Sequence, residues 1–344
     1  MKKFNANAYA NFHAVIGRYQ LSITLESLEQ IYNEPHRHFH TTQHLNEIMN
    51  KIASIDNAQE LDISMYDELV LTTMYHDIVY YPWLNDNEEK SADFVLKTMA
   101  RSPLRDRVFE NVLQTKKHDG QTAVQLLFNK LDFGGLKDPA FTDIAKLIEA
   151  EHQIFKEYNF NDIDSYIDGR INFYKSITNG SPLIPQMIDY VKNRQYTVAI
   201  YPGSFNPFHI GHLNVLEKAE QLFDKVIILK GVNAEKAASI GTDAVNELKK
   251  QLPNREVISY AGNIIEKYFV GNKRNPVLIR GLRNGYDLVY EESYLTFCKD
   301  FHPELRYALI LCDKEFSHVS SSSIRAVANS HVANKYTVQW YIKS

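Results

Sequence analysis

The feature that most constrains the fold of this chain is a change of hydrophobic pattern near residue 180. Before it, apolar residues recur at spacings of three and four, as in "QHLNEIMNKIASI" (43–55) and "DELVLTTMYHDIVYY" (67–81), which is typical of amphipathic helices. After it, β-rich runs alternate with helical ones, as in "KVIILKG" (225–231) and "NELKKQL" (246–252). Because 344 residues also exceed what one hydrophobic core usually supports, we predict two domains.

Turn-forming residues mark the boundary between the two patterns. "ITNGSPLIPQ" (177–186) gathers asparagine, glycine, serine and proline. We therefore place an all-α domain at 1–180, a linker at 181–195 and an α/β domain at 196–344. Five β-rich runs in the second domain alternate with helical segments, which predicts a Rossmann-like parallel sheet covered on both faces. The predicted strands are "YTVAIY", "KVIILKG", "EVISYAG", "PVLIRG" and "YALILC".

Charge and composition narrow the classes of partner. A net charge of −4 gives no attraction to a nucleic acid polymer or an anionic membrane. No apolar run approaches the roughly 18 residues of a spanning helix, and "MKKFNANAYANFHAV" lacks the apolar core of a signal peptide. Two cysteines cannot build a disulfide framework. We therefore expect a cytoplasmic protein that acts on small molecules. We also expect it to form a homo-oligomer.

Phosphate-binding residue types follow four of the five predicted strands. The segments are "PGSFNPFHIGH" (202–212), "GVNAEK" (231–236), "RGLRNG" (280–285) and "SHVSSSSIR" (317–325). Ligands bind open α/β sheets at the strand carboxyl ends, so these segments together predict a triphosphate site. His209 and His212 are three apart, so a helix would place them on one face near an N-terminus that favours an anion. Each motif alone also fits packed histidines, surface ion pairs or a loop.

These segments resemble the HxGH nucleotidyltransferases, and among them the phosphopantetheine adenylyltransferase family. The similar segments cover about residues 196–330 and include "YPGSFNPFHIGHLNVLEKAEQLFDKVI", "VLIRGLRNGYDLVYEE", "HPELRYALIL" and "HVSSSSIR". The resemblance implies adenylyl transfer from ATP to a phosphorylated acceptor, with Mg²⁺ and release of pyrophosphate. It makes 4′-phosphopantetheine the expected acceptor and coenzyme A biosynthesis the expected pathway.

The resemblance also assigns roles by position. His212 would stabilise charge at the α-phosphate, and Lys236 and Arg280 would hold phosphates. The residues implied in binding ATP and acceptor are Gly203, Ser204, Phe205, His209, Arg283, Glu291, Ser320, Ser321 and Ser322. Two positions depart from the family, which usually has threonine at the place of His209 and aspartate at the place of Asn206. "GSFNPFHIGH" is closer in style to nicotinamide or nicotinate mononucleotide adenylyltransferases, so a mononucleotide is the alternative acceptor.

Histidine and aspartate cluster in the first half. In "RHFHTTQHLNEI", His40 and His44 are one helical turn apart on a predicted single face. His76 and Asp77 are adjacent at the end of an apolar run, and a buried charge needs a partner. Asp132 in "NKLDFGGL" could complete a set of two imidazoles and two carboxylates, which suits a divalent metal. Three other features are left open. Asp138 competes with Asp132 for the last position. The pair His118-Asp119 is predicted to lie at the rim or to contact phosphate, and His36 and His38 are predicted to be solvated.

This pattern resembles the HD-domain metal-dependent phosphohydrolases over about residues 5–178. The resemblance implies that His44, His76, Asp77 and Asp132 bind Mn²⁺, Mg²⁺, Fe²⁺ or Zn²⁺. By the same resemblance His40 takes the place of the general acid of related cyclic-nucleotide phosphodiesterases. Glu88 or Glu89 would hold a bridging water or support the metal ligands from behind.

Three interpretations of the whole chain follow. The first is a bifunctional enzyme, an adenylyltransferase joined to a phosphohydrolase that attacks a phosphate ester with metal-activated water. The second is a transferase with a non-catalytic helical module for assembly or regulation. The third is a ligand sensor in which neither site turns over.

Overall fold

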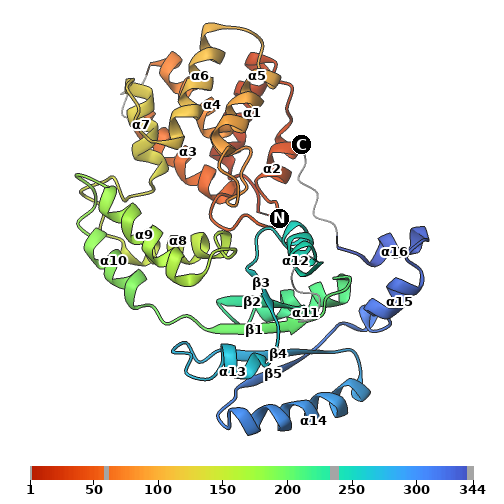
Figure 1. The fold of residues 1–344 in the computed structure, drawn as a ribbon. Coiled ribbons are helices and arrows are strands. Elements are labelled where there is room, and N and C mark those ends of the chain that lie inside the picture. Colours follow the sequence, from red (N-terminus) through yellow and green to blue (C-terminus); the bar gives the residue numbers. More distant parts are fainter. Residues whose placement is uncertain (1, 58–61, 233–239, 339–344) are drawn as a thin grey trace. The chain divides into compact units, whose positions relative to one another are not determined.

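The computed structural model describes residues 2–57, 62–232 and 240–338 (Figure 1). The chain divides into two compact units, Met1–Tyr158 with Ile163–Asn193, and Asn159–Asp162 with Arg194–Ser344. The segment that the sequence analysis treated as a linker contains a helix, α10 (Ile184–Asn193). This helix belongs to the first unit because Met187 and Val191 are buried in its core.

The first unit is all-helical, as predicted. Its described residues form ten α-helices and no strand: α1 (Ala6–Tyr19), α2 (Leu25–Ile31), α3 (Thr42–Asn57), α4 (Ile63–Tyr75), α5 (Asn87–Thr98), α6 (Pro103–Leu113), α7 (Ala123–Asp132), α8 (Ile144–Glu157), α9 (Ile163–Ser176) and α10. Helix α4 is buried from Asp67 to Tyr75, and α1, α3, α6 and α7 pack around it. Nine consecutive buried residues cover every side of a helix, so the end of α4 lies deep in the unit.

Local capping fixes the helix that brings Asp132 to the core. Thr122 accepts a hydrogen bond from the main-chain N–H of Gln125, and the Gln125 side chain reaches back to the N–H of Thr122. This capping box satisfies two otherwise unpaired donors at the start of α7. The helix then runs to Asp132 with Val124, Phe128 and Leu131 in the core.

The second unit contains the predicted five-stranded parallel sheet, in the order β3-β2-β1-β4-β5. The strands are β1 (Val198–Gly203), β2 (Lys225–Gly231), β3 (Val257–Tyr260), β4 (Val277–Leu282) and β5 (Tyr307–Leu311). All five β-rich runs of the sequence correspond to these strands. The strand order reverses between β1 and β4, and ligands bind α/β sheets beyond the strand ends at such a reversal.

Side chains on successive strand residues enter two different cores. Ala199 and Tyr201 of β1 pack with α11 (Ile210–Glu220) and α12 (Ile240–Gln251). Ile200, between them, packs with α13 (Ile264–Tyr268) and α14 (Gly285–Phe301) on the opposite face. Two short helices, α15 (Ser321–Ala326) and α16 (His331–Tyr336), follow β5.

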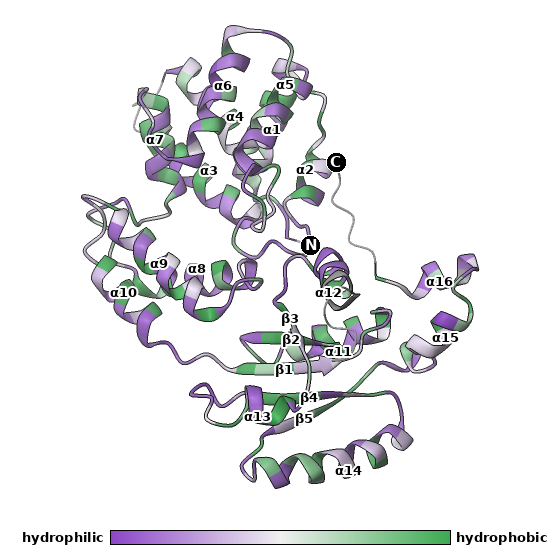
Figure 2. Ribbon diagram, in the orientation of Figure 1, coloured by the Kyte–Doolittle hydropathy of each residue, from purple (hydrophilic) through white to green (hydrophobic). Residues whose placement is uncertain are grey.

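Figure 2 shows strands β1, β2 and β4 as mainly hydrophobic, as expected for a sheet that is covered on both faces. Among the described residues, no helix is both long enough and apolar enough to cross a membrane.

Candidate functional sites

Four residues of the first unit bring imidazole and carboxylate groups to one point in the helical core. His44 lies on α3, His76 and Asp77 follow the last residue of α4, and Asp132 ends α7. The ligand atoms of His44, His76 and Asp77 all lie within 4.8 Å of one another. Asp132 Oδ1 is 3.0 Å from His44 Nε2 and 3.5 Å from His76 Nε2. The structure therefore gathers the four side chains that the sequence analysis assigned to metal binding.

The surroundings of His76 test whether this cluster fits a cation. Its Nδ1 lies 3.0 Å from the Thr73 carbonyl, which can only accept, so Nδ1 carries a proton and Nε2 is the nitrogen left to bind a cation. That Nε2 atom is buried and makes no hydrogen bond, although an Asp77 carboxylate oxygen lies 3.0 Å away. Carboxylate oxygens this close need a positive charge at Nε2. Without a metal a proton supplies it, since despite burial Asp77 and Asp132 raise the pKa of His76 to about 9, and a bound cation would take the place of that proton. The donor set fits a divalent ion of the kind that binds imidazole and carboxylate together.

Glu157, at the end of α8, is a buried carboxylate that the sequence analysis did not single out. Its Oε1 accepts the main-chain N–H groups of residues 38, 39 and 40 at 2.7–2.9 Å. Its Oε2 accepts from His40 Nδ1 at 2.6 Å and from the Tyr80 hydroxyl at 2.9 Å. Burial alone would raise the pKa of Glu157, but His40 and the N–H groups lower it to about 2. The ionised carboxylate holds His40 with its Nε2 3.9 Å from Asp77.

The prediction that His40 and His44 share a helix face was wrong, because α3 begins only at Thr42. His40 lies in the turn before the helix, where Glu157 takes up the main-chain N–H groups. The two imidazoles still come close, with ring centroids 5.8 Å apart. Nothing in the local sequence could have predicted this, since Glu157 comes from a helix more than a hundred residues later.

A pocket of about 280 Å³ opens onto the cluster. Six polar residues named so far line it, together with aromatic side chains: His40, His76, Asp77, Glu88, His118 and Asp132, with Phe39, Tyr80, Phe133, Tyr158 and Phe173. Ligand pockets are typically apolar or aromatic with a few convergent polar groups. This pocket therefore has the composition of a site for a small organic ligand beside a metal centre.

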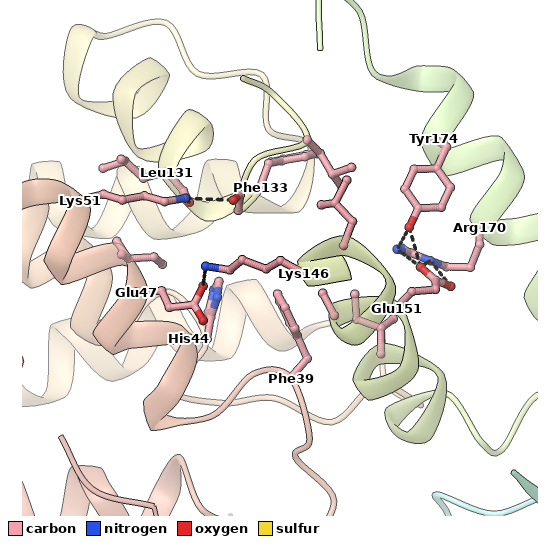
Figure 3. A pocket seen from close by; sticks show the side chains of 16 residues that line it. Phe39, His44, Glu47, Lys51, Leu131, Phe133, Lys146, Glu151, Arg170 and Tyr174 are labelled. Carbon is pink, nitrogen blue, oxygen red and sulfur yellow. Dashed lines mark hydrogen bonds and ion pairs between the residues drawn. The ribbon is translucent and has the colours of Figure 1, made fainter. Parts of the chain in front are cut away.

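A second pocket lies beside His44 (Figure 3). Its volume is about 60 Å³, which is room for a few water molecules. The charged groups around it already have partners. Lys146 Nζ lies 2.7 Å from Glu47, and Arg170 lies 2.7 Å from Glu151. The larger pocket is therefore the candidate substrate site.

The other polar residues of this region divide between the site and the surface. His118 lines the larger pocket, with its Nε2 3.1 Å from Asp132 Oδ2. Glu88 lines the same pocket, and burial raises the pKa of its carboxyl. Glu89 instead pairs with Lys116 at 2.5 Å.

Two further positions complete the description of this half. Asp138 accepts the N–H of Ala140 within a turn, and the metal cluster contains Asp132 instead. The prediction that His36 is solvated was wrong. Its ring is buried, with Nε2 2.6 Å from the Tyr80 carbonyl, and burial lowers its pKa to about 4.

In the second unit, His209 and His212 meet at the start of α11. His209 is the N-cap residue, and its Nδ1 accepts the N–H of His212 while His212 Nδ1 accepts the N–H of His209, each at 3.4 Å. The rings stack with centroids 3.6 Å apart. The spacing of three therefore places the two rings together at the start of the helix, as predicted, and it does so through a capping box.

This arrangement makes both histidines neutral hydrogen-bond donors. Burial and the charge of Arg283 lower the pKa of His209 to about 4. Burial lowers the pKa of His212 well below its usual value, and His209 and nearby cations strengthen the effect. Since each Nδ1 accepts a hydrogen bond, the proton of the neutral ring is on Nε2. Both rings can therefore donate a hydrogen bond from Nε2–H to an anionic ligand.

A pocket of about 130 Å³ joins three of the strand-end segments. His209 and His212 come from the β1–α11 segment, Arg283 follows β4, and Ser320 and Ser321 begin α15. These five residues were all assigned to ATP or acceptor from the sequence. Basic and hydroxyl groups at the point where the strand order reverses can bind phosphate oxygens.

Other predicted residues lie near this pocket without lining it. Arg280 forms a two-pronged ion pair with buried Glu291, at 2.6 and 2.7 Å. Ser204 and Ser322 are exposed, and Ser322 Oγ accepts from Arg325 at 3.1 Å.

Phe205 contributes through packing. Its ring is buried with its centroid 5.1 Å from that of His212. A Cβ on residue 203 would come within 2.7 Å of the Phe205 ring, so glycine at 203 leaves room for it.

Of two lysines in this region, one was predicted as a site residue and the other was not. Lys236, predicted to hold a phosphate, lies outside the described residues. Lys230, which the sequence analysis did not select, is buried at the end of β2 and donates to the carbonyls of Ser204 and Phe205. A lysine inside the apolar run "KVIILKG" was the available signal, because a buried ammonium needs a partner.

Comparison with known proteins agrees with the fold of the second unit. Residues 200–327 match the cytidylyltransferase-like family. Phosphopantetheine adenylyltransferase of Clostridium tetani (strain Massachusetts / E88) is 33% identical over 135 residues, which are 38% of this chain and 83% of that protein. The enzyme of the same name from Clostridium botulinum (strain Hall) is 33% identical over 134 residues, 38% of this chain and 80% of that protein.

One solved structure, from Vibrio parahaemolyticus and named for a nicotinate-nucleotide adenylyltransferase, is 18% identical and covers 41% of this chain and 86% of its own. Its TM-score of 0.28 is too low to support an argument. The two phosphopantetheine adenylyltransferases do support a family assignment, because this chain spans most of the length of each. Through its C-terminal half the chain belongs to the cytidylyltransferase-like family of nucleotidyltransferases, where phosphopantetheine adenylyltransferases are among its relatives.

Proposed function

We propose that the second unit transfers the adenylyl group of ATP to 4′-phosphopantetheine. A phosphate oxygen of the acceptor attacks the α-phosphorus, the bond to the β-phosphate oxygen breaks, and pyrophosphate leaves. The observation that carries the proposal is the pocket in which neutral His209 and His212 meet Arg283 and two serines. The names of the relatives that are 33% identical supply the acceptor.

The chain's own residues would act by binding and orientation, without a covalent intermediate. Nε2–H of His212 would donate to an α-phosphate oxygen as negative charge develops there. Arg283 and the hydroxyls of Ser320 and Ser321 would hold the β- and γ-phosphates. Mg²⁺, when bound, would neutralise part of the phosphate charge.

Arg280 and Lys236 stay proposed phosphate contacts. Of the five N–H donors of Arg280, those of Nε and Nη2 face Glu291. Nη1 donates to the Pro202 carbonyl at 3.5 Å, and its second N–H is the donor proposed to serve a ligand.

A direct assay separates this acceptor from the alternative. The full-length protein would be incubated with ATP, Mg²⁺ and either 4′-phosphopantetheine or nicotinamide mononucleotide, and pyrophosphate release would be followed. We expect a higher kcat/KM with 4′-phosphopantetheine. Equal or higher activity with the mononucleotide would replace the acceptor and would explain why His209 stands where the pantetheine family usually has threonine.

We also propose that the first unit is a metal-dependent phosphohydrolase. His44, His76, Asp77 and Asp132 would hold the ion, and the buried Nε2 of His76 without a hydrogen bond carries this assignment. A bound divalent ion would supply Lewis acidity and activate water. His40, held by Glu157, would donate a proton to the leaving oxygen of the ester. The chain would then be a bifunctional enzyme.

Metal analysis and phosphate release test the second activity. We expect the purified full-length protein to carry about one divalent ion per site, and to release phosphate or alcohol from a chromogenic phosphate ester and from members of a nucleotide panel. The alternative is a helical module for assembly or regulation. A protein that binds no added Mn²⁺, Fe²⁺ or Zn²⁺ and hydrolyses none of these esters would establish that alternative.

A further inference from the structure

Strand β2 carries two buried lysines, one at each end. Lys225 and Lys230 are only 1% and 6% exposed, and burial lowers the pKa of both ammonium groups. A buried charge has to be compensated by partners. The two lysines have different kinds of partner, and they lie at opposite ends of the strand.

Lys225, at the start of β2, has structural partners. Its Nζ lies 3.0 Å from a Glu256 carboxylate oxygen. It also donates to the carbonyl of Asn161 at 2.7 Å and to the carbonyl of Asn159. These groups lie at the amino-terminal ends of the strands, away from the pocket at the carboxyl-terminal ends, because β2 runs from Lys225 toward Gly231.

Lys230 has no carboxylate within 4 Å in the part of the chain that the structure describes. Its Nζ donates instead to the carbonyl of Ser204 and, over a longer distance of 3.5 Å, to the next carbonyl, that of Phe205. They belong to the turn that follows β1, whose last residue, Gly203, pairs with Lys230 in the sheet. A full positive charge is thus placed directly behind the segment that leads to His209.

Holding these two carbonyls fixes the direction of two N–H groups. In a trans peptide the C=O and the following N–H point in opposite directions. When the carbonyls of Ser204 and Phe205 point at Lys230, the N–H groups of Phe205 and Asn206 must point away from it. Neither N–H group has a hydrogen-bond partner among the described residues. Ser204 and Asn206 are exposed whereas Lys230 is buried, so these donors face the open side of the turn.

We propose that Lys230 is a positioning residue of the nucleotidyltransferase site. Its ammonium holds the turn after β1 so that the N–H groups of Phe205 and Asn206 face the phosphate that is transferred. The same contact seats Phe205, which has a positive φ of 41° and packs against His212. The inference rests on the nucleotidyl transfer proposed above and adds a residue to it.

The charge of Lys230 favours phosphate binding, as does its position behind the turn. It is one of the cations that disfavour protonation of His212 and so lower the pKa of that ring. A cation with no carboxylate partner, behind two outward-facing N–H groups, also favours an anion in front of them. Phosphate binding would therefore gain from both the orientation of the turn and the field behind it.

The experiment compares the two lysines of β2. K230M and K225M each remove a buried ammonium from the same strand, and K230R keeps a cation in a planar shape that cannot sit between two carbonyls as a single Nζ does. For each full-length variant, kcat and KM for pyrophosphate release, the Kd of ATP and the thermal midpoint would be measured. We expect K230M to lower kcat about 10- to 100-fold and weaken ATP binding, because small misplacements of phosphate donors are costly.

The matched control decides whether the effect is specific. We expect K225M to lower the thermal midpoint at least as much as K230M while leaving kcat within about twofold, and K230R to recover part of the lost kcat. A wild-type kcat in K230M, or equal losses of kcat in K230M and K225M, would overturn the proposal. If K230M does not fold, K230R takes its place, with an expected loss of about tenfold.

The ATP measurement separates this inference from the proposed function. If the wild-type protein uses neither acceptor, the acceptor assignment fails. Weaker ATP binding in K230M than in K225M would still support the role of Lys230. Equal ATP binding in the two variants would overturn it.

Discussion

Both units build a pocket around histidines, but the neighbouring groups give these histidines opposite properties. In the first unit His40 is buried, which alone would lower its pKa, yet Glu157 and Asp77 raise it. In the second unit burial lowers the pKa of His209 to about 4, and Arg283 acts in the same direction. Histidines therefore belong to a site that favours positive charge in the first unit and to a site that favours a bound anion in the second unit.

The difference shows that burial disfavours any charge on a side chain, and that the neighbouring groups decide whether a positive or a negative charge is favoured at the site. Carboxylates surround the imidazoles of the first unit, so a positive charge is needed to satisfy them. Arginine, lysine and helix N–H groups surround the histidines of the second unit, so neutral rings donate to negative oxygens. The following predictions test this contrast, from the largest expected effect to the smallest.

Removing one carboxylate from the cationic site should abolish its function. In D77A we expect bound divalent metal and phosphate-ester hydrolysis to fall to background, because a site built from few protein ligands loses most of its affinity with one of them. Metal content by mass spectrometry and ester hydrolysis are the measurements. Pyrophosphate release by the second unit should stay within about twofold. Full metal content in D77A would contradict the ligand assignment.

Removing one imidazole from the anionic site should affect turnover more than binding. We expect H212A to lower kcat for pyrophosphate release by about 10²- to 10³-fold and to change the Kd of ATP by less than about tenfold. The reason is that the Nε2–H bond strengthens as charge develops on the α-phosphate. Calorimetric ATP titration beside the kinetic assay distinguishes the two effects. A collapse of ATP affinity instead would assign His212 to ground-state binding.

The carboxylate that orients His40 should matter for hydrolysis but not for metal content. We expect E157Q to lower ester hydrolysis about 10- to 100-fold while metal stoichiometry is kept. The matched control is E151Q on the same helix, because Glu151 contacts neither His40 nor the larger pocket, although its partner Arg170 lines that pocket. That variant should lower the thermal midpoint with a smaller loss of hydrolysis. Equal kinetic losses in both variants would point to a general structural effect.

The neutral histidines of the second unit should make stability depend on pH. The pKa of His209 lies below its unfolded value, so the unfolded chain binds more protons, and stability falls as pH decreases from about 6.5 to about 4. We expect H209N, which keeps an N-capping side chain, to reduce this dependence. Thermal midpoints of the two proteins at pH 7.5, 6.5 and 5.5 provide the measurement. Parallel curves would show that His209 is not buried as a neutral ring.

The fold was predictable because its signals are local. Apolar spacing of three and four marks helices such as α3 and α8, and short β-branched runs mark strands such as β2. The strand-end motifs placed His209, His212 and Arg283 at one edge because parallel strands end together. The start of α3 was not predictable, because Glu157 captures the N–H groups of the preceding turn from a distant helix.

The sequence by itself determined the two-part organisation and the residue types at each site, through periodicity and strand-end position. Only the tertiary structure decided which partners these residues have. It brought Asp132 and not Asp138 to His44, buried His36, and set Glu157 behind His40 and Lys230 behind the turn at Ser204. The physical reason is that a buried charge is compensated by whatever group packing brings within a few ångströms, and that group can lie anywhere in the sequence.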